Sequence, residues 1–418
     1  MSLLNLLPML ITVFGLYFLI KLRFFFIIHP IAVFKRLFNA FRDKSSRKSL
    51  ALALAGTLGV GNIVGVAYGI SVGGAGSIFW ILVSSIFAAV IKYAESTLAA
   101  DKRSDGCGGM SYVIKSSFKR LGYPLATVYA ILCLLLSLTM GSALQSQSAI
   151  GAAEEIVKFN PYILSVFFVI ITLAVVLGGA KKIENATAII IPLSTIVYVD
   201  ICLAVVFTNL SRLPAALSEI INGAFNFKSF GGGVSSFLVI TAMKEGYARG
   251  LLSNEAGAGT SSMAQARSEN SPSEVGLLGI CEVLFDTVLL CTLTGITVLV
   301  SGVDTTGRSG IAIVSNAISG ALGKGSGFLL FLLVFAFAYS TVVCWYYYGS
   351  ECVKFITGKH RSCIFTLLFV FSVFVGFLVP SSLLINVTDY ILFFMTLLTL
   401  ATLTKNSERI VSLSEQIY

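Results

Sequence analysis

Long apolar runs alternate with short polar connections along almost the whole chain. A helix needs about 20 apolar residues to cross the hydrocarbon layer of a bilayer. The runs therefore predict an all-α membrane protein with about 11 transmembrane helices. They lie near 3–20, 49–72, 75–100, 124–151, 162–179, 186–209, 233–262, 275–301, 327–349, 362–378 and 383–403.

Glycine-rich stretches interrupt two of these runs, at 56–65 (GTLGVGNIVG) and at 253–259 (SNEAGAG). Glycine costs ~1 kcal/mol against alanine within a helix. Irregular backbone at membrane depth is tolerated only where it is buried in protein or lines a cavity. Breaks at matching points of two halves indicate a transporter's binding site, so we expect a carrier of a small solute.

The positions of the breaks also predict how the chain is organised, which we treat as one membrane domain, 1–418. The helix and basic connection at 1–48 are an addition. We expect this helix to be retained, because no small-residue cleavage site follows it. The remaining runs divide into repeats at 49–209 and 233–403, each beginning with a broken helix, which predicts a five-plus-five inverted repeat.

Composition agrees with a membrane protein, since 56% of residues are hydrophobic, only 12% are charged and the mean hydropathy is +0.91. Soluble domains usually carry about 25% charged residues. The eight cysteines include no CxxC pair, so neither a disulfide framework nor a zinc site is indicated.

Charge is distributed unequally between the two sides of the predicted bundle. Connections on one side carry 19 lysines and arginines; those on the other carry only Lys158, Arg212, Lys228, Arg308 and Lys324. The richer side is expected in the cytoplasm, with the amino terminus outside and the carboxyl terminus inside. We expect the cytoplasmic membrane of a bacterium, and the net charge of +9 requires no nucleic-acid partner.

The glycines of the first break fall into two groups. Gly65, Gly69 and Gly73 recur every four residues, which is typical of a close-packing seam between helices. Gly56, Gly59 and Gly61 are denser than packing requires. They indicate an unwound stretch whose amides meet a substrate carboxylate and whose carbonyls meet a cation, with Thr57 and Asn62 beside it.

The second break carries Arg249, Ser253, Asn254 and Glu255 within one apolar run. Ionisable groups at membrane depth are costly and usually functional. If the run instead ended near 252 at the cytoplasmic face, this stretch would be a surface loop with Glu255 paired to Lys244 or Arg249. Both interpretations are open at this point.

Asp286 is expected in mid-helix, where Glu282 is its only charged neighbour within one turn. A cation ligand and a partner for Arg249 are both open roles for it. Asp200 and Asp389 lie nearer helix ends that the pattern does not fix, so no role is assigned to them.

Two further polar groups interrupt apolar helices. Gln145, Gln147 and Ser148 suit either substrate contact or interhelical hydrogen bonds, which are worth ~0.6 kcal/mol on average. Thr341 and Trp345, four residues apart, share one helix face with Ser340 nearby. Hydroxyls suit a hard cation and an indole makes a rigid pocket wall, whereas an aromatic helix end at the interface fits Tyr346–Tyr348 better.

These stretches together resemble the alanine or glycine:cation symporter family, also called the sodium:alanine symporters. The match runs in order from about 55 to 350, and SNEAG after RG is its most specific part. The matching stretches are 56–67 (GTLGVGNIVGVA), 73–80 (GGAGSIFW), 92–95 (KYAE), 145–148 (QSQS), 249–257 (RGLLSNEAG), 286–287 (DT), 337–341 (FAYST) and 345–349 (WYYYG).

The resemblance implies a leucine-transporter-type fold and uptake of alanine or glycine coupled to sodium, or alternatively to protons, with no cofactor. It implies that sodium is held by Ser340, Thr341 and carbonyls of the first break, including that of Gly56. The residues implied to surround the amino acid are Thr57, Gly59, Gly61, Asn62, Gln145, Leu252, Ser253, Asn254, Thr341 and Trp345.

The chain departs from the family pattern at three places. Ala75 replaces the proline of the Gly-Gly-Pro-Gly stretch, Leu252 stands where phenylalanine is frequent, and 258–265 reads AGTSSMAQ instead of an alanine- and histidine-bearing tail. Leu252 widens the expected pocket, which leaves open the choice among D-alanine, L-alanine and glycine.

An intramembrane enzyme and a channel both fit the sequence less well than a transporter does. Residues 69–73 match the nucleophile-elbow pattern GxSxG, but that motif needs a histidine base, and His29 and His360 both lie at segment ends. A channel needs no paired broken helices. The principal alternative is a transporter of the same fold for another small solute.

Overall fold

The computed structural model describes residues 6–103, 108–225, 233–323, 325–359 and 362–415, and all regular elements within them are helical. The helices that occupy the predicted apolar runs are α1 (Leu6–Lys21), α4 (Lys44–Thr57), α5 (Val64–Gly73), α6 (Gly76–Asp101), α8 (Gly122–Leu138), α9 (Gln145–Ile156), α10 (Pro161–Val176), α11 (Ala180–Thr208), α13 (Gly233–Asn254), α15 (Pro272–Val283), α16 (Thr292–Ser301), α18 (Gly325–Thr357), α19 (Cys363–Val375) and α20 (Ser381–Lys405). Between and beside them lie α2 (Phe25–Ile28), α3 (Pro30–Ala40), α7 (Met110–Ser117), α12 (Leu213–Phe225), α14 (Ser262–Gln265), α17 (Gly310–Leu322) and α21 (Ser407–Ser414).

Each predicted run thus corresponds to helix, but the lengths differ. Within the described ranges, 6 helical stretches are long and apolar enough to cross a membrane, and α4 with α5 makes a seventh if the bent pair is one span. The apolar helices α1, α10, α17 and α19 are shorter. The count of 11 spans and the inverted repeat remain predictions.

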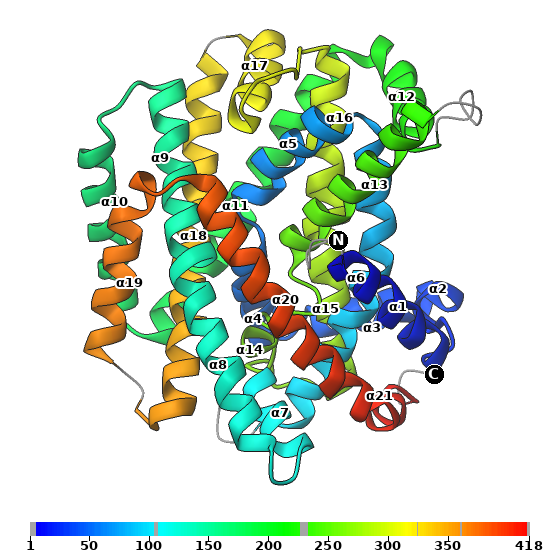
Figure 1. Ribbon diagram of the computed structural model, residues 1–418, viewed down its shortest axis with the longest axis vertical. Coiled ribbons are helices and arrows are strands. Elements are labelled where there is room, and N and C mark those ends of the chain that lie inside the picture. Colours follow the sequence, from blue (N-terminus) through cyan, green and yellow to red (C-terminus); the bar gives the residue numbers. More distant parts are fainter. Residues whose placement is uncertain (1–5, 104–107, 226–232, 324, 360–361, 416–418) are drawn as a thin grey trace.

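Two groups of helices flank the interrupted pair α4–α5 (Figure 1). In one group, α6 packs against α1, α13 and α15; in the other, α18 packs against α8, α9 and α11. Helices α10 and α19 pair at the outer edge of the second group (Figure 1). Because α4 also contacts α18 while α5 contacts α13, the first break lies between the two groups.

Local sequence explains where several helices begin. Asp43 Oδ2 accepts the backbone N–H of Ser46 at 2.8 Å and caps α4. Asn160 caps α10 in the same way, and Pro161 follows it at the first helical position. Proline is tolerated there because its missing N–H would lack a helical partner anyway.

Three features differ from the expected pattern. Helices α12 and α17, which lie in the connections after α11 and α16, were not predicted. The π-helical segments η3 (Thr139–Leu144) and η6 (Leu284–Cys291) interrupt otherwise apolar runs. The predicted span at 233–262 is helical only in part, since α13 ends at Asn254 and only the four residues of α14 follow.

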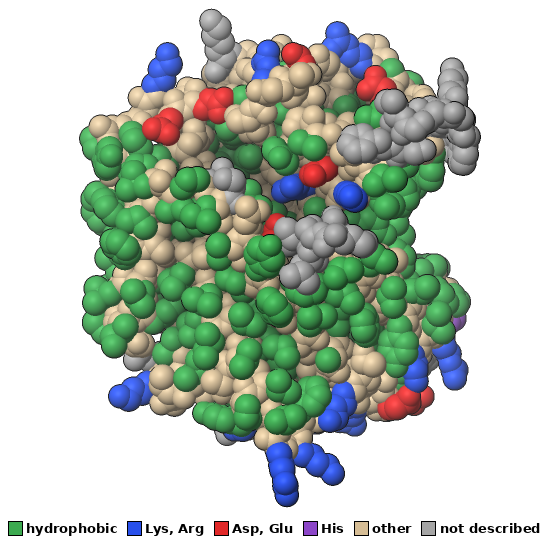
Figure 2. Space-filling view, viewed as in Figure 1, with side chains coloured by type: hydrophobic (Ala, Val, Ile, Leu, Met, Phe, Trp, Pro, Cys, Tyr) green, Lys and Arg blue, Asp and Glu red, His purple; other side chains and the backbone are tan. Residues whose placement is uncertain are grey.

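Apolar and charged side chains occupy different zones along the length of the molecule. Figure 2 shows hydrophobic side chains over the middle of one face, with charged side chains gathered towards the two ends. A hollow in the upper half of that face also contains side chains of both charges (Figure 2). An apolar band between charged ends is the arrangement that a lipid bilayer requires.

Candidate functional site

The first break separates α4 from α5, and the two helices are bent by 64°. Helix α4 ends at Thr57, Gly59 is extended, and the short 3-10 turn η2 covers Val60–Asn62. The backbone N–H of Gly59 donates to the Asn62 side chain at 3.2 Å. The predicted break of the α-helix is therefore confirmed, with Gly59 extended and Gly61 within the 3-10 turn.

Gly56 departs from this prediction, because it lies inside α4 rather than in the unwound stretch. A β-carbon added there would lie 2.8 Å from Tyr348 Oη, so close packing explains this glycine. Its carbonyl accepts the indole N–H of Trp345 at 3.3 Å. Thr57, also helical and buried, directs its hydroxyl to the Ala53 carbonyl at 3.4 Å.

Polar groups from two other helices close one side of the first break. Gln145 Oε1 accepts the N–H of Val60 at 3.4 Å, and Thr341 Oγ1 donates to the Leu58 carbonyl at 3.4 Å. A β-carbon added at Gly59 would lie 3.1 Å from Gln145 Oε1 and 3.2 Å from Thr341 Oγ1. The structure therefore brings Gln145, Thr341 and the break together, as the resemblance implied.

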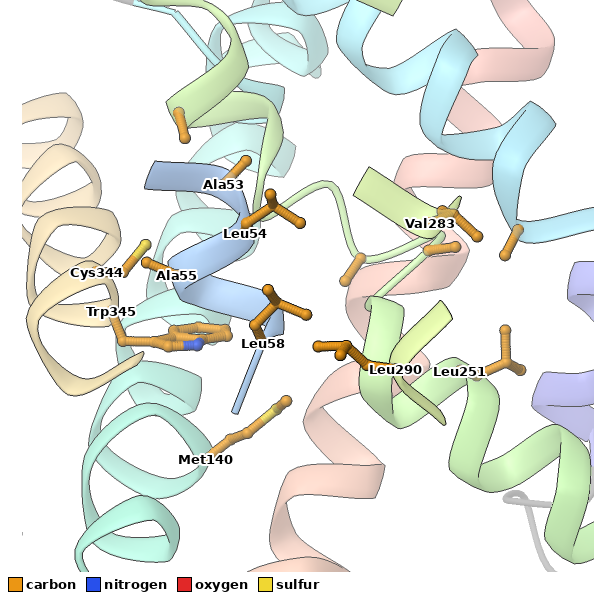
Figure 3. Close-up of a cluster of buried hydrophobic side chains, with 14 of the residues drawn as sticks. Ala53, Leu54, Ala55, Leu58, Met140, Leu251, Val283, Leu290, Cys344 and Trp345 are labelled. Carbon is orange, nitrogen blue, oxygen red and sulfur yellow. The ribbon is translucent and has the colours of Figure 1, made fainter. Parts of the chain in front are cut away.

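Trp345 forms the wall beside this group. Figure 3 shows its indole reaching from α18 towards Leu58, directly after α4, with Met140 nearby. The indole is fully buried and packs on Gly141, where an added β-carbon would lie 2.3 Å from it. The expected common face of Thr341 and Trp345 is confirmed, since Thr341 contacts Leu58 and Trp345 contacts Gly56, both at the end of α4 beside the first break.

Gly61 lies on the open side of the break. An added β-carbon would meet nothing within 4 Å, and the residue is half-buried. By contrast, one at Gly69 would lie 3.0 Å from Arg249, and one at Gly73 would lie 3.0 Å from Glu245, so the packing seam of α5 against α13 is confirmed. Open space beside a backbone break is where a ligand can approach amides and carbonyls.

The second break begins directly after Asn254, so Ser253 and Asn254 are still helical. The Asn254 side chain accepts the N–H of Ala256 at 3.0 Å, just after the end of α13, and it donates to Thr287 Oγ1 at 3.1 Å. Glu255, with φ of 54°, is in the left-handed region that non-glycine residues rarely adopt. Glu255 is 2% exposed, so the surface-loop interpretation is wrong.

A residue of the first break and a residue of the last turn of α13 meet at Asp286, in the π-helical segment η6. Its Oδ1 accepts the side-chain N–H of Asn62 at 2.6 Å, and its Oδ2 accepts the hydroxyls of Ser253 at 2.8 Å and Thr287 at 2.7 Å. All four side chains are buried. A buried carboxylate is tolerated where donors surround it, and here they connect the two breaks.

Three residues predicted to contribute to the site have other contacts among the described residues. Arg249 pairs with Glu245 at 3.2 Å, so the pairing of Arg249 with Asp286 was wrong. Ser340 donates to Phe337 within its own helix at 2.9 Å. Leu252 lines a small cavity against α1 and α20 instead of joining the group around Trp345.

Sequence reasoning also missed two contacts in which an aromatic side chain packs against a glycine on another helix. Tyr346–Tyr348 are buried in the protein rather than placed at an interface. Tyr348 fills the space opposite Gly56, and Gly141 makes room for Trp345. Complementary large and small residues on separate helices give no signal within either stretch of sequence.

A sequence profile described as the sodium:alanine symporter family matches residues 1–416. The chain belongs to the sodium:alanine symporter family. The sodium/alanine symporter AgcS of Methanococcus maripaludis is 32% identical over 359 residues, covering 83% of this chain and 78% of its own length. The probable sodium/glutamine symporter GlnT of Bacillus subtilis is 29% identical, covering 86% of this chain and 76% of GlnT.

Members of this family are transporters, so the symporter described here is an integral membrane carrier and not an enzyme. The crystal structure of MhsT in complex with L-phenylalanine matches with a TM-score of 0.52 at 14% identity, covering 88% of this chain and 98% of MhsT. That likeness concerns the fold alone, and it agrees with the leucine-transporter-type fold expected of the family.

Proposed function

We propose that this symporter couples inward sodium movement, or alternatively proton movement, to uptake of alanine or glycine by alternating access. The observation that carries the proposal is the first break, where Gly61 faces open space while Gln145, Thr341 and Trp345 surround the other side. Unwound amides at a helix start favour an anionic group such as an amino-acid carboxylate.

The amino acid would lie with its carboxylate towards Gly61 and the start of α5. Asn62 and Ser253 fix the far side of this space through Asp286, with Asn254 beside them. The space lined by Leu58, Gly59, Asn62 and Phe337 is narrow here, with no room for a water molecule. An amino acid would therefore enter from the open side at Gly61, and the bulk of Trp345 on the other side of the break supports a preference for a small side chain.

Sodium would lie where the Leu58 carbonyl and Thr341 hydroxyl meet, 3.4 Å apart. Such hard oxygen ligands suit an alkali cation. Ser340 and the Gly56 carbonyl are the remaining proposed ligands. Binding of sodium would require local rearrangement. Ser340 and Thr341 each donate to the Phe337 carbonyl at 2.9 Å, and the Gly56 carbonyl accepts the Trp345 indole.

The principal alternative is another small amino acid carried by the same machinery. GlnT, 29% identical, is described as a probable glutamine carrier, which shows that related chains are associated with different substrates. The proposed setting is the cytoplasmic membrane of a bacterium, with the amino terminus outside, the carboxyl terminus inside and repeats at 49–209 and 233–403.

Uptake into proteoliposomes tests the proposal directly. Purified protein would be reconstituted and given radiolabelled alanine, glycine or glutamine under an inward sodium gradient, an inward proton gradient or neither. We expect accumulation of alanine or glycine that requires an ion gradient and collapses when it is dissipated. Gradient-independent equilibration, or accumulation of glutamine alone, would contradict the proposed function.

A further inference from the structure

A second group of charged side chains lies deep in the protein around the second break. Lys92 and Glu95 come from α6, Glu282 from α15, and Glu255 directly follows α13. Lys92, Glu95 and Glu282 are 0% exposed and Glu255 is 2% exposed. Three carboxyl groups therefore share one ammonium group in an environment that strongly disfavours unbalanced charge.

The ammonium group is already engaged by one of the three. Lys92 Nζ lies 2.9 Å from Glu282 Oε1 and donates to Ser261 Oγ at 2.7 Å. Glu95 Oε1 accepts the backbone N–H of Gly257 at 2.8 Å. No ion pair within 4 Å joins Glu95 or Glu255 to a cation in the described parts of the chain.

Glu255 is held in an unusual way. Its Oε2 accepts the hydroxyl of Thr260 at 2.5 Å, whereas its buried Oε1 has no hydrogen-bond partner among the described residues. The backbone holds this glutamate at a φ of 54°. Strained backbone of this kind persists where the surrounding structure enforces it, often at functional sites.

The same side chain lines a cavity of about 70 Å³ between α1, α13 and α20. Asp389 and Thr396 of α20 line it as well, and Leu7, Leu251 and Leu252 supply much of its apolar wall. This volume is enough to hold water. Water in the cavity would connect Glu255 with Asp389, which is only partly buried.

We propose that Glu255 is a proton-binding site, loaded through the cavity shared with Asp389. Its carboxylate takes a proton to become a neutral carboxylic acid and releases that proton on the other side of the membrane as alanine is delivered. A proton fits better than a metal ion. Only three lining side chains offer oxygen, whereas hard cations take about six oxygen ligands.

The position of Glu255 explains how its charge would affect transport. It directly follows Ser253 and Asn254, which contact Asp286 and Thr287 in η6. Neutralising the carboxyl group removes a buried negative charge at the joint between α13 and the second break. Charged or titratable groups face Glu255 from all the surrounding helices. They are Lys92, Glu95, Tyr129, Glu282, Asp286, Cys344, Tyr348 and Asp389.

Simultaneous measurement of alanine and protons tests this site, and its coupling role depends on the proposed function. Proteoliposomes containing a pH-sensitive dye would receive radiolabelled alanine under a sodium gradient, using the native protein, Glu255→Gln and, as control, the exposed surface variant Glu219→Gln. The amide of the Glu255→Gln variant retains an acceptor for Thr260, so we expect this variant to fold and bind alanine. We expect the native protein and the control to acidify the lumen with alanine, and Glu255→Gln to lose that signal.

Native protein that accumulates alanine without acidification would overturn the inference, as would full acidification by Glu255→Gln. Absence of alanine uptake would contradict the proposed function instead. In that case infrared difference spectra between acidic and alkaline buffer test the site alone. Exposed carboxyl groups give a broad carbonyl band in both proteins, whereas a carboxylic acid shielded from water gives a separate band at higher frequency. We expect this separate band in the native protein and not in Glu255→Gln, and an identical separate band in both proteins would overturn the assignment.

Discussion

The side-chain amide of Asn62 lies 2.6 Å from Asp286 Oδ1, and through this contact the first break is joined to η6. Ser253 donates to the other oxygen of the same carboxylate at 2.8 Å. One buried carboxylate therefore fixes a residue of the first break against the end of α13. Movement of either break should therefore shift the other, because both are hydrogen-bonded to this carboxylate.

Asp286→Asn tests that connection. Asparagine offers one acceptor oxygen where aspartate offers two, so the donor of Asn62 or of Ser253 loses its partner. A buried donor without a partner costs about 1–3 kcal/mol, and we expect a lower unfolding temperature with weaker alanine binding. Asp304→Asn, in an exposed turn, is the matched control. Unchanged alanine affinity in Asp286→Asn would show that the breaks are positioned independently.

Thr341 should set the sodium requirement of transport. Thr341→Val keeps the shape of the side chain and removes the hydroxyl that meets the Leu58 carbonyl. We expect the sodium concentration for half-maximal uptake to rise about tenfold, equivalent to ~1.4 kcal/mol. Thr341→Ser, which retains the hydroxyl, should remain near the native value. Equal sodium dependence in the two variants would remove Thr341 from the sodium site.

Trp345 should limit the size of the amino acid that is carried. Trp345→Ala removes the wall packed on Gly141 and the N–H bound to Gly56. We expect weaker alanine uptake, with serine, valine or glutamine becoming better competitors, and a loss of stability of about 3–5 kcal/mol. Competition assays measure this rank order against that of the native protein. An unchanged rank order of amino acids would show that another residue limits the size of the substrate.

Sequence alone predicted the helical class, the position of the first break and most of the residues around it. Gly59 and Gly61 were informative because glycine is unfavourable in a helix. Thr341 and Trp345 could be paired because a four-residue spacing puts them on one face. Both inferences depend on relations within one short stretch of chain.

Contacts between distant stretches were harder to predict. The choice of Glu245 rather than Asp286 as the partner of Arg249 depends on how α13 rotates in the bundle. Leu252 faces α1 and α20 although its neighbour Ser253 faces η6. The π-helical segments η3 and η6 carry no composition that marks them as π-helical. Both are helical and mix apolar residues with polar ones such as Ser142 and Asp286, as neighbouring helices do.

The most direct test of the proposed substrate site compares Gly61→Ala with Gly73→Ala by thermal unfolding, with and without alanine. A methyl group at Gly61 meets nothing within 4 Å, so this variant should fold like the native protein and occupy space meant for the substrate. A methyl group at Gly73 would lie 3.0 Å from Glu245 and 3.2 Å from the Ala242 backbone, so it should lower stability while preserving binding. We expect Gly61→Ala to lose the alanine-induced rise in unfolding temperature and Gly73→Ala to keep it. A full alanine-induced rise in Gly61→Ala would contradict the placement of the substrate at the first break.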